Sequence, residues 1–162
     1  MNVDHLVGGA LDYWTALAEG HRAELRGMYG QDYCRIDVPY DGFQIFAPTT
    51  NSKLAADIAF KRAYTLYPHP CLNACGVQET IWLAEAQMNR QFHGMHTDLN
   101  PRVAICRLRV SEAIAEGTLD PTKPPRPMLS TAEYEHLALR QLTDDQARMS
   151  YQRWAARPSR NA

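Results

Sequence analysis

The sequence predicts a compact α+β protein, an α-β-α sandwich in which helices cover a small, mostly antiparallel sheet. Amphipathic periodicity occurs at 6–19, 51–66 and 101–116, which indicates three helices. The runs between them include short stretches rich in aromatic and β-branched residues, as is typical of strands. With 162 residues, of which 45% are hydrophobic, the chain can bury a core of its own.

The first helix is expected over 6–19, because its apolar residues recur three and four positions apart and Gly20 ends the pattern. A β-hairpin is expected to follow. Its strands are predicted at 33–38 and 43–46, with the turn-forming residues 39–42 between them.

The second helix is expected over 51–66, with either Thr50 or Asn51 as its N-cap. Apolar and charged residues fall on opposite sides of this stretch, which favours a helix that packs through one face. Residues 67–78 contain two prolines and a glycine and show no periodicity, so this segment is expected to be a loop.

A strand is expected at 79–88, buried on both faces, although helix propensity also allows a helix over 83–90. The third helix then has clear boundary signals. Asn100 is its predicted cap, Pro101 occupies its first position and Gly117 ends it.

The C-terminal quarter begins with four prolines in the eleven residues 118–128, which indicates a stiff, extended linker. Capping-box patterns beginning at Ser130 and Thr143 then predict two short helices that form an outward-pointing hairpin. The expected organisation is a sandwich domain at 1–117, a linker at 118–129, a helical hairpin appendage at 130–157 and a basic tail at 158–162.

Composition excludes several classes of partner. Seventeen Lys and Arg residues against eighteen Asp and Glu residues give a formal charge of −1, so there is no global nucleic-acid signal. No secretory signal and no run of about eighteen apolar residues occurs, so we expect a cytoplasmic protein with no membrane contact. Its four cysteines are then expected to be reduced thiols or metal ligands rather than a disulfide framework.

The common catalytic motifs are absent from the sequence: there is no GxxxxGK[ST] loop, no GxGxxG, no GxSxG and no HExxH. Cys106 lies on the apolar stripe of the third predicted helix and Cys34 lies in a predicted strand, and each thiol is expected to behave as a small buried hydrophobe rather than a nucleophile. We therefore expect a protein that is not an enzyme and has no cofactor.

A zinc site is the sharpest metal hypothesis. Cys71 and Cys75, followed by His93 and His96, supply the ligand types of a Cys2His2 site. Their spacing departs from that of zinc fingers, so we expect an ordinary cysteine pair and no bound metal. The segment containing the histidines is expected to be a turn, in which the imidazoles either bind a ligand or face water.

The best candidate ligand site is the segment 48–53 at the start of the second helix. Hydroxyl, amide and ammonium groups at a helix N-terminus can bind an anion, although a simple helix cap explains the same residues. Trp82, Tyr13 and Trp14 are candidate stacking surfaces, although Trp82 is alternatively a core residue. Arginines of the third helix, including Arg107 and Arg109, by default form a solvated face. The predicted ligand-binding residues are Thr49, Thr50, Asn51, Lys53, Trp82, His93, His96 and Arg102.

Four segments resemble a known family: LDYWTALAEG at 11–20, APTTN at 47–51, the pair Trp82 and Ala84, and PRVAICR at 101–107. Their order and spacing are similar to those of the Nin-region X proteins of lambdoid phages, the phage α-β-α sandwich proteins. The resemblance covers about residues 3–118. It implies an α-β-α sandwich in an infected bacterium, and the family has no assigned activity.

The expected function is a phage-encoded accessory protein that binds rather than catalyses. Counter-defence by sequestering a small anionic, nucleotide-like host ligand is the leading hypothesis. A protein inhibitor or adaptor of a host factor, acting through the hairpin at 130–157, is the alternative, and an unrecognised small hydrolase is a second alternative. Self-association into a homo-oligomer is an open alternative.

Overall fold

The computed structural model describes residues 1–28, 30–38, 42–86, 92–123, 126–130, 132–133, 145–146 and 149. Within these ranges the chain is an α+β protein with antiparallel sheets, as expected. The elements are a 3-10 helix η1 (Val3–His5), α1 (Gly8–Ala18), β1 (Ala23–Met28), β2 (Gln31–Val38), β3 (Gly42–Ile45), α2 (Ser52–Arg62), β4 (Tyr64–Leu72), β5 (Gln78–Ala86), β6 (Met95–Asp98) and α3 (Pro101–Ala115).

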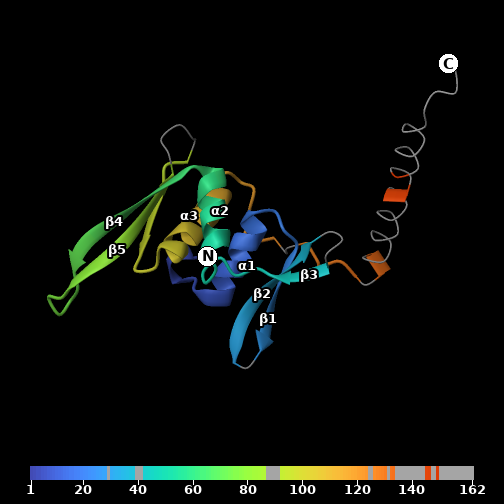
Figure 1. The fold of residues 1–162 in the computed structure, drawn as a ribbon, viewed down its shortest axis with the longest axis horizontal. Coiled ribbons are helices and arrows are strands. Elements are labelled where there is room, and N and C mark those ends of the chain that lie inside the picture. The colour runs from blue at the N-terminus through green and yellow to red at the C-terminus, as the bar shows by residue number, and fades with distance from the viewer. Residues whose placement is uncertain are drawn as a thin grey trace, which may run out of the picture.

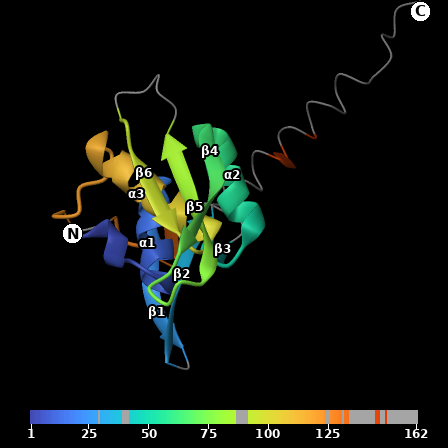
Figure 2. The ribbon, with the colours of Figure 1, turned by 90° about the vertical axis from the view of Figure 1, so that its left-hand side faces the viewer.

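The strands form two three-stranded sheets, ordered β1-β2-β3 and β4-β5-β6, where a single sheet was expected. The helices lie between them: α1 packs on β1 and β2, α3 packs on β5 and β6, and the two helices pack on each other (Figures 1 and 2). Every residue at 104–110 of α3 is buried, because neighbours surround this helix on several sides. The sheets are therefore the outer layers.

The first sheet contains the predicted hairpin of β2 and β3 together with a strand that was not predicted. β1 was missed because its sequence, AELRGM, contains two charged residues and a glycine. The turn expected at 39–42 falls largely outside the described residues. Gly9 of α1 approaches the backbone of β2 so closely that a Cβ there would overlap the Asp32 carbonyl and lie 2.9 Å from the Tyr33 nitrogen.

The second helix ends earlier than expected. Asn51 is its N-cap, and Ala63 adopts a left-handed conformation (φ 53°) that ends it at residue 62. β4 begins immediately afterwards, so the loop expected at 67–78 is wrong as far as residue 72. The two prolines of β4 are tolerated because β4 is an edge strand. Residues two apart direct their backbone nitrogens to the same side, so both prolines can place their nitrogens at the unpaired edge.

The strand expected at 79–88 is confirmed as β5, but only its inner face is well buried. Ala84 and Ala86, two residues apart, are buried against the helices, whereas their neighbours on the opposite face are partly exposed. The turn expected around the histidines is wrong in its second half, because β6 begins at Met95 and pairs with β5.

The boundary signals of α3 are confirmed. Asn100 accepts a hydrogen bond from the Arg102 amide and Gly117 adopts positive φ. The predicted capping box at Ser130 is also present, because the Ser130 amide and hydroxyl donate to Glu133 Oε2 at 2.7 and 2.8 Å. Most of the expected hairpin, including its second box at Thr143, lies outside the described residues.

Described residues near both ends of the segment 117–130 contact the domain. The Leu119 side chain is 8% exposed and packs in a core cluster with α1 and α3. The Leu129 amide donates to Asp37 Oδ2 of β2 at 2.6 Å. We call the described residues of this segment, 117–123 and 126–130, the strap. None of the helices in the described ranges is both long and apolar enough to cross a membrane.

Truncation tests the position of the domain boundary. A chain ending at Glu133 is expected to unfold at the same urea concentration as the full chain. A chain ending at Gly117 is expected to be less stable, because removal of the Leu119 side chain alone costs about 1.5–3 kcal/mol. Leu119→Ala in the full chain should reproduce most of this loss. Equal stability of the two truncated chains would place the boundary back at residue 117.

Candidate functional site

A groove lies between α2, the start of α3 and the beginning of β4, and its volume is about 700 Å³. One wall is formed by alanines spaced four residues apart on α2. Side chains at this spacing lie on the same face of a helix, and small side chains on that face leave space for a cavity. Ile105 of α3 and Leu66 of β4 add apolar surface. We call this cavity the α2–α3 groove; its lining residues are Ser52, Ala55, Ala56, Ala59, Phe60, Ala63, Tyr64, Leu66, Asn100, Pro101, Arg102 and Ile105.

The guanidinium of Arg102 stands at the polar end of the α2–α3 groove. Its Nε donates to Asn100 Oδ1 at 3.1 Å, and its Nη1 donates to the Thr50 carbonyl at 3.2 Å and to Ser52 Oγ at 3.3 Å. All three acceptors are neutral. Across the described part of the chain, Arg102 has no ion pair with a carboxylate. Its positive charge is therefore held in place but not neutralised.

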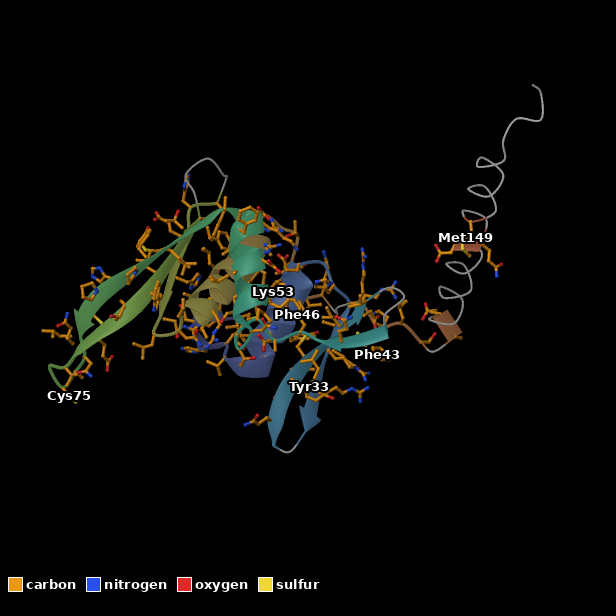
Figure 3. All side chains as sticks on the ribbon, in the orientation of Figure 1. Tyr33, Phe43, Phe46, Lys53, Cys75 and Met149 are labelled. Carbon is orange, nitrogen blue, oxygen red and sulfur yellow. The ribbon has the colours of Figure 1, made fainter. Side chains whose placement is uncertain are left out.

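The N-terminus of α2 meets this guanidinium. Asn51 Oδ1 accepts from the amides of Lys53 and Leu54 at 3.0 and 3.3 Å, which confirms the capping reading of this residue. The two amides are consequently occupied by the cap. The Lys53 side chain is exposed beside them (Figure 3). An anion at this position would thus meet side-chain cations rather than free backbone donors.

Thr49 has a different role from the one expected. Its amide and its hydroxyl donate to the two carboxylate oxygens of Asp12, each at 2.9 Å, and both residues are buried. Burial raises the pKa of Asp12, while the hydrogen bonds from Thr49 oppose that shift. This contact holds the loop before α2 against α1. Thr49 therefore positions that loop and does not line the groove.

Trp82 and the two histidines do not join the groove. Trp82 is half-buried on β5, opposite Asp98 of β6. His96 lies between Asp4 Oδ1 at 3.1 Å and Ser111 Oγ at 2.7 Å, and burial lowers its pKa despite the nearby carboxylate. His93 is exposed. The structure therefore brings together Thr50, Asn51, Lys53 and Arg102 and places Trp82, His93 and His96 elsewhere.

The cysteines and histidines of the zinc hypothesis are separated by the strand register. Cys71 pairs with Glu79 at one end of β5, and His96 pairs with Ala84. Five residues of extended strand span roughly 17 Å, far beyond the reach of one metal ion. Cys75 lies still farther out, at the tip of the β4–β5 hairpin (Figure 3).

Arg107 and Arg109 were expected on a solvated face, and both are buried. Arg107 Nη1 contacts Asp98 Oδ2 at 2.9 Å. Arg109 pairs with Glu19 at 2.6 Å and with Glu112 at 3.4 Å. These two arginines are not at the surface because α3 is enclosed between a sheet and α1. Their charges are matched by carboxylates and serve to join elements.

The cysteines of the core are shielded from solvent. Cys34 and Cys106 are fully buried, as expected, and burial raises the pKa of each thiol to about 12. Tyr64, at the margin of the α2–α3 groove, donates its hydroxyl to Glu112 Oε2 at 2.6 Å. Its pKa is raised, first by burial and then by this carboxylate, so its proton is firmly held.

The sequence matches no protein-family model and no curated protein.

The groove itself was not predicted from the sequence, because the predicted site was built from polar residues. A usable signal was present, since Ala55, Ala59 and Ala63 recur every four residues on the predicted second helix.

Proposed function

We propose that this chain is a phage-encoded accessory protein that binds a small organic anion of the nucleotide class in the α2–α3 groove without converting it. In this role it would sequester a host signal and so act in counter-defence. The observation that carries the proposal is the guanidinium of Arg102, which has no carboxylate partner among the described residues, at one end of a mostly apolar cavity. That pairing of one cation with an apolar wall fits a ligand that has an anionic group and a flat or apolar body.

The polar end supports recognition of phosphate or carboxylate. Arg102 is held by three hydrogen bonds, so its donors are already oriented before a ligand arrives. Lys53 and the Ser52 hydroxyl stand in the first turn of α2, where the helix dipole favours negative charge. A ligand anion would therefore gain a charge-assisted hydrogen bond at low ordering cost.

The apolar end supports recognition of the rest of the ligand. Ala59 and Ile105 are buried at its floor, and Phe60 is 88% exposed beside it. An exposed phenyl ring next to alanine-sized side chains offers a surface on which a planar group can lie. The cavity volume also falls within the range of about 300–1,000 Å³ usual for small-molecule sites.

The Ile105 methyl resonance provides a direct test, with adenosine 5′-monophosphate (AMP) as probe and adenosine as the uncharged comparison. AMP is expected to shift this resonance saturably. Arg102→Ala should weaken binding by about tenfold to a hundredfold, the usual effect of losing a charge-assisted hydrogen bond. Ala56→Leu should weaken it separately by filling the apolar end. Arg26→Ala, which removes an exposed charge on β1, is the matched control.

Thr49 is left unchanged in these variants, because its contact with Asp12 would confuse a binding loss with a folding loss. An AMP response of Ile105 that survives in Arg102→Ala, or that adenosine produces equally well, would rule out the proposed anion site.

The alternative function, a protein inhibitor or adaptor, has one observation in its favour. The outer face of the second sheet is covered by no other described element, and it carries Tyr67 and Met95 as exposed residues next to half-buried Ile81 and Leu83. The hairpin on which this alternative was first based lies mostly outside the described residues. Failure of the groove variants to affect any ligand would move this alternative ahead.

A further inference from the structure

A second cavity lies at the opposite end of α3, between the end of α1 and the strap. Its volume is about 400 Å³, which is also within the range of small-molecule sites. Trp14 and His21 line one side, and Leu119, Lys123 and Arg126 line the other. We call this cavity the strap pocket.

The roof of the strap pocket is fixed at both ends. The amides of Thr118 and Leu119 donate to the Ala113 carbonyl, each at 3.0 Å, and the Leu119 side chain is buried. At the other end the Leu129 amide donates to the Asp37 carboxylate. The described residues of the strap are thus held over the cavity by contacts with α3 and β2.

Aromatic rings form the inner wall. Trp14 is half-buried and packs edge-on against Tyr13, with ring centroids 5.5 Å apart. His21 packs against Phe46 at 5.4 Å. Such contacts restrict the ring orientations, so little entropy is lost when a planar ligand stacks there. An indole is the side chain best suited to stack on a nucleobase.

The mouth of the pocket is positively charged. Lys123 and Arg126 are both exposed there. Lys123 Nζ contacts Asp120 Oδ2 at 3.2 Å, and Asp120 is occupied further by the Thr122 hydroxyl at 2.6 Å. Arg126 has no ion pair within the ranges that the structure describes. Among the described lining residues, the carboxylate of Asp120 therefore stands against the two cations of Lys123 and Arg126.

The helix ends that meet at the pocket do not leave their carbonyls open. The Gly20 amide donates to Leu17 and the His21 amide to Ala16, both at 3.0 Å, and the Gly117 amide donates to Ile114 at 3.1 Å. These bonds occupy the Ala16, Leu17 and Ile114 carbonyls. A ligand anion would accordingly be placed at the mouth, away from the helix ends, and its ring at the inner wall.

We propose that the strap pocket is a second ligand site, separate from the α2–α3 groove, for a planar aromatic anion such as a nucleoside monophosphate. The ring lies against Trp14, and the phosphate is bound by Lys123 and Arg126. This site does not depend on the function proposed for the groove, because the two cavities share no lining residue.

The test uses the full chain labelled with ¹⁵N and follows the Trp14 indole N–H during titration with AMP, adenosine and inorganic phosphate. AMP is expected to shift this resonance saturably and more tightly than either fragment. The double variant Lys123→Ala/Arg126→Ala should weaken AMP binding at Trp14 at least tenfold. Both side chains are exposed, so its melting temperature should match that of the parent protein.

The charge-matched control is Lys53→Ala/Arg102→Ala, which removes the groove cation Arg102 and the cation Lys53 in the first turn of α2 and should leave the Trp14 response intact. Loss of the Trp14 response in this control would show that the signal comes from the groove and would overturn the strap site. So would an absent response to millimolar AMP, or equal affinity for AMP and inorganic phosphate. Loss of the Ile105 response alone in the control would report on the groove only.

Discussion

Arg109→Met is expected to destabilise the protein by about 3–5 kcal/mol, the usual result of removing one partner from a buried ion pair. Arg109 is 1% exposed and Glu112 is fully buried. Methionine has a similar length but no charge, so the carboxylate of Glu112 would lose the nearer of the two arginines that the structure places beside it. Arg62, at 3.9 Å, is a more distant and more exposed substitute. Urea unfolding measures the change.

A second variant separates lost charge balance from lost packing. Arg109→Met/Glu112→Gln removes both charges and keeps an amide oxygen that can accept from Tyr64, so it should be more stable than Arg109→Met alone. Arg26→Met, in an exposed pair with Glu24, should cause no measurable change. If Arg109→Met unfolds at the same urea concentration as the parent protein, the buried cluster does not join α1 to α3 as described.

Gly9→Ala is expected to destabilise the protein strongly. Overpacking typically costs about 1–3 kcal/mol, and we expect a loss of stability at or above the upper end of that range. A Cβ at this position would overlap the Asp32 carbonyl, and the obstacle is backbone, which cannot rotate away as a side chain can. Relief requires α1 to move from β2. We expect a lower melting temperature and altered amide resonances along both elements.

Gly27→Ala is the matched control for this substitution. Among the described residues, a Cβ there would meet the Asp32 side chain alone, at the ordinary distance of 3.6 Å. Its melting temperature should therefore change much less. Equal effects of the two substitutions would indicate that the loss comes from glycine replacement in general and not from the approach of α1 to β2.

Local signals of the chain predicted the elements whose boundaries are set by their own residues. Asn51 and Asn100 cap helices whatever lies around them, and Gly117 ends α3 through its positive φ. β4 was missed because Pro68 and Pro70 argue against a strand unless its edge position is known. That position depends on the whole sheet and cannot be read from local sequence.

The candidate site was predictable only in its polar part. Thr50, Asn51 and Lys53 are neighbours in sequence, whereas the approach of Arg102 to Thr50 joins residues 52 positions apart. Thr49 looked like a ligand donor because its partner Asp12 belongs to another helix. Arg109 looked solvated for a related reason. Charges alone do not reveal which helix lies in the middle of a fold.

The placement of α1 and α3 between the two sheets has a consequence for the order of folding. Arg109 of α3 is 90 positions from Glu19 and 91 from Ala18 at the end of α1, and it contacts both, so the central layer joins segments that lie far apart in the chain. While the chain is being synthesised, α1 can pack on β1 and β2 but has no helix to cover its other side. Contacts of such long sequence separation slow folding, because the chain must close a large loop before they form. The apolar side of α1 is then exposed until α3 has been made, which is the interval in which this protein is most open to aggregation or to capture by a chaperone.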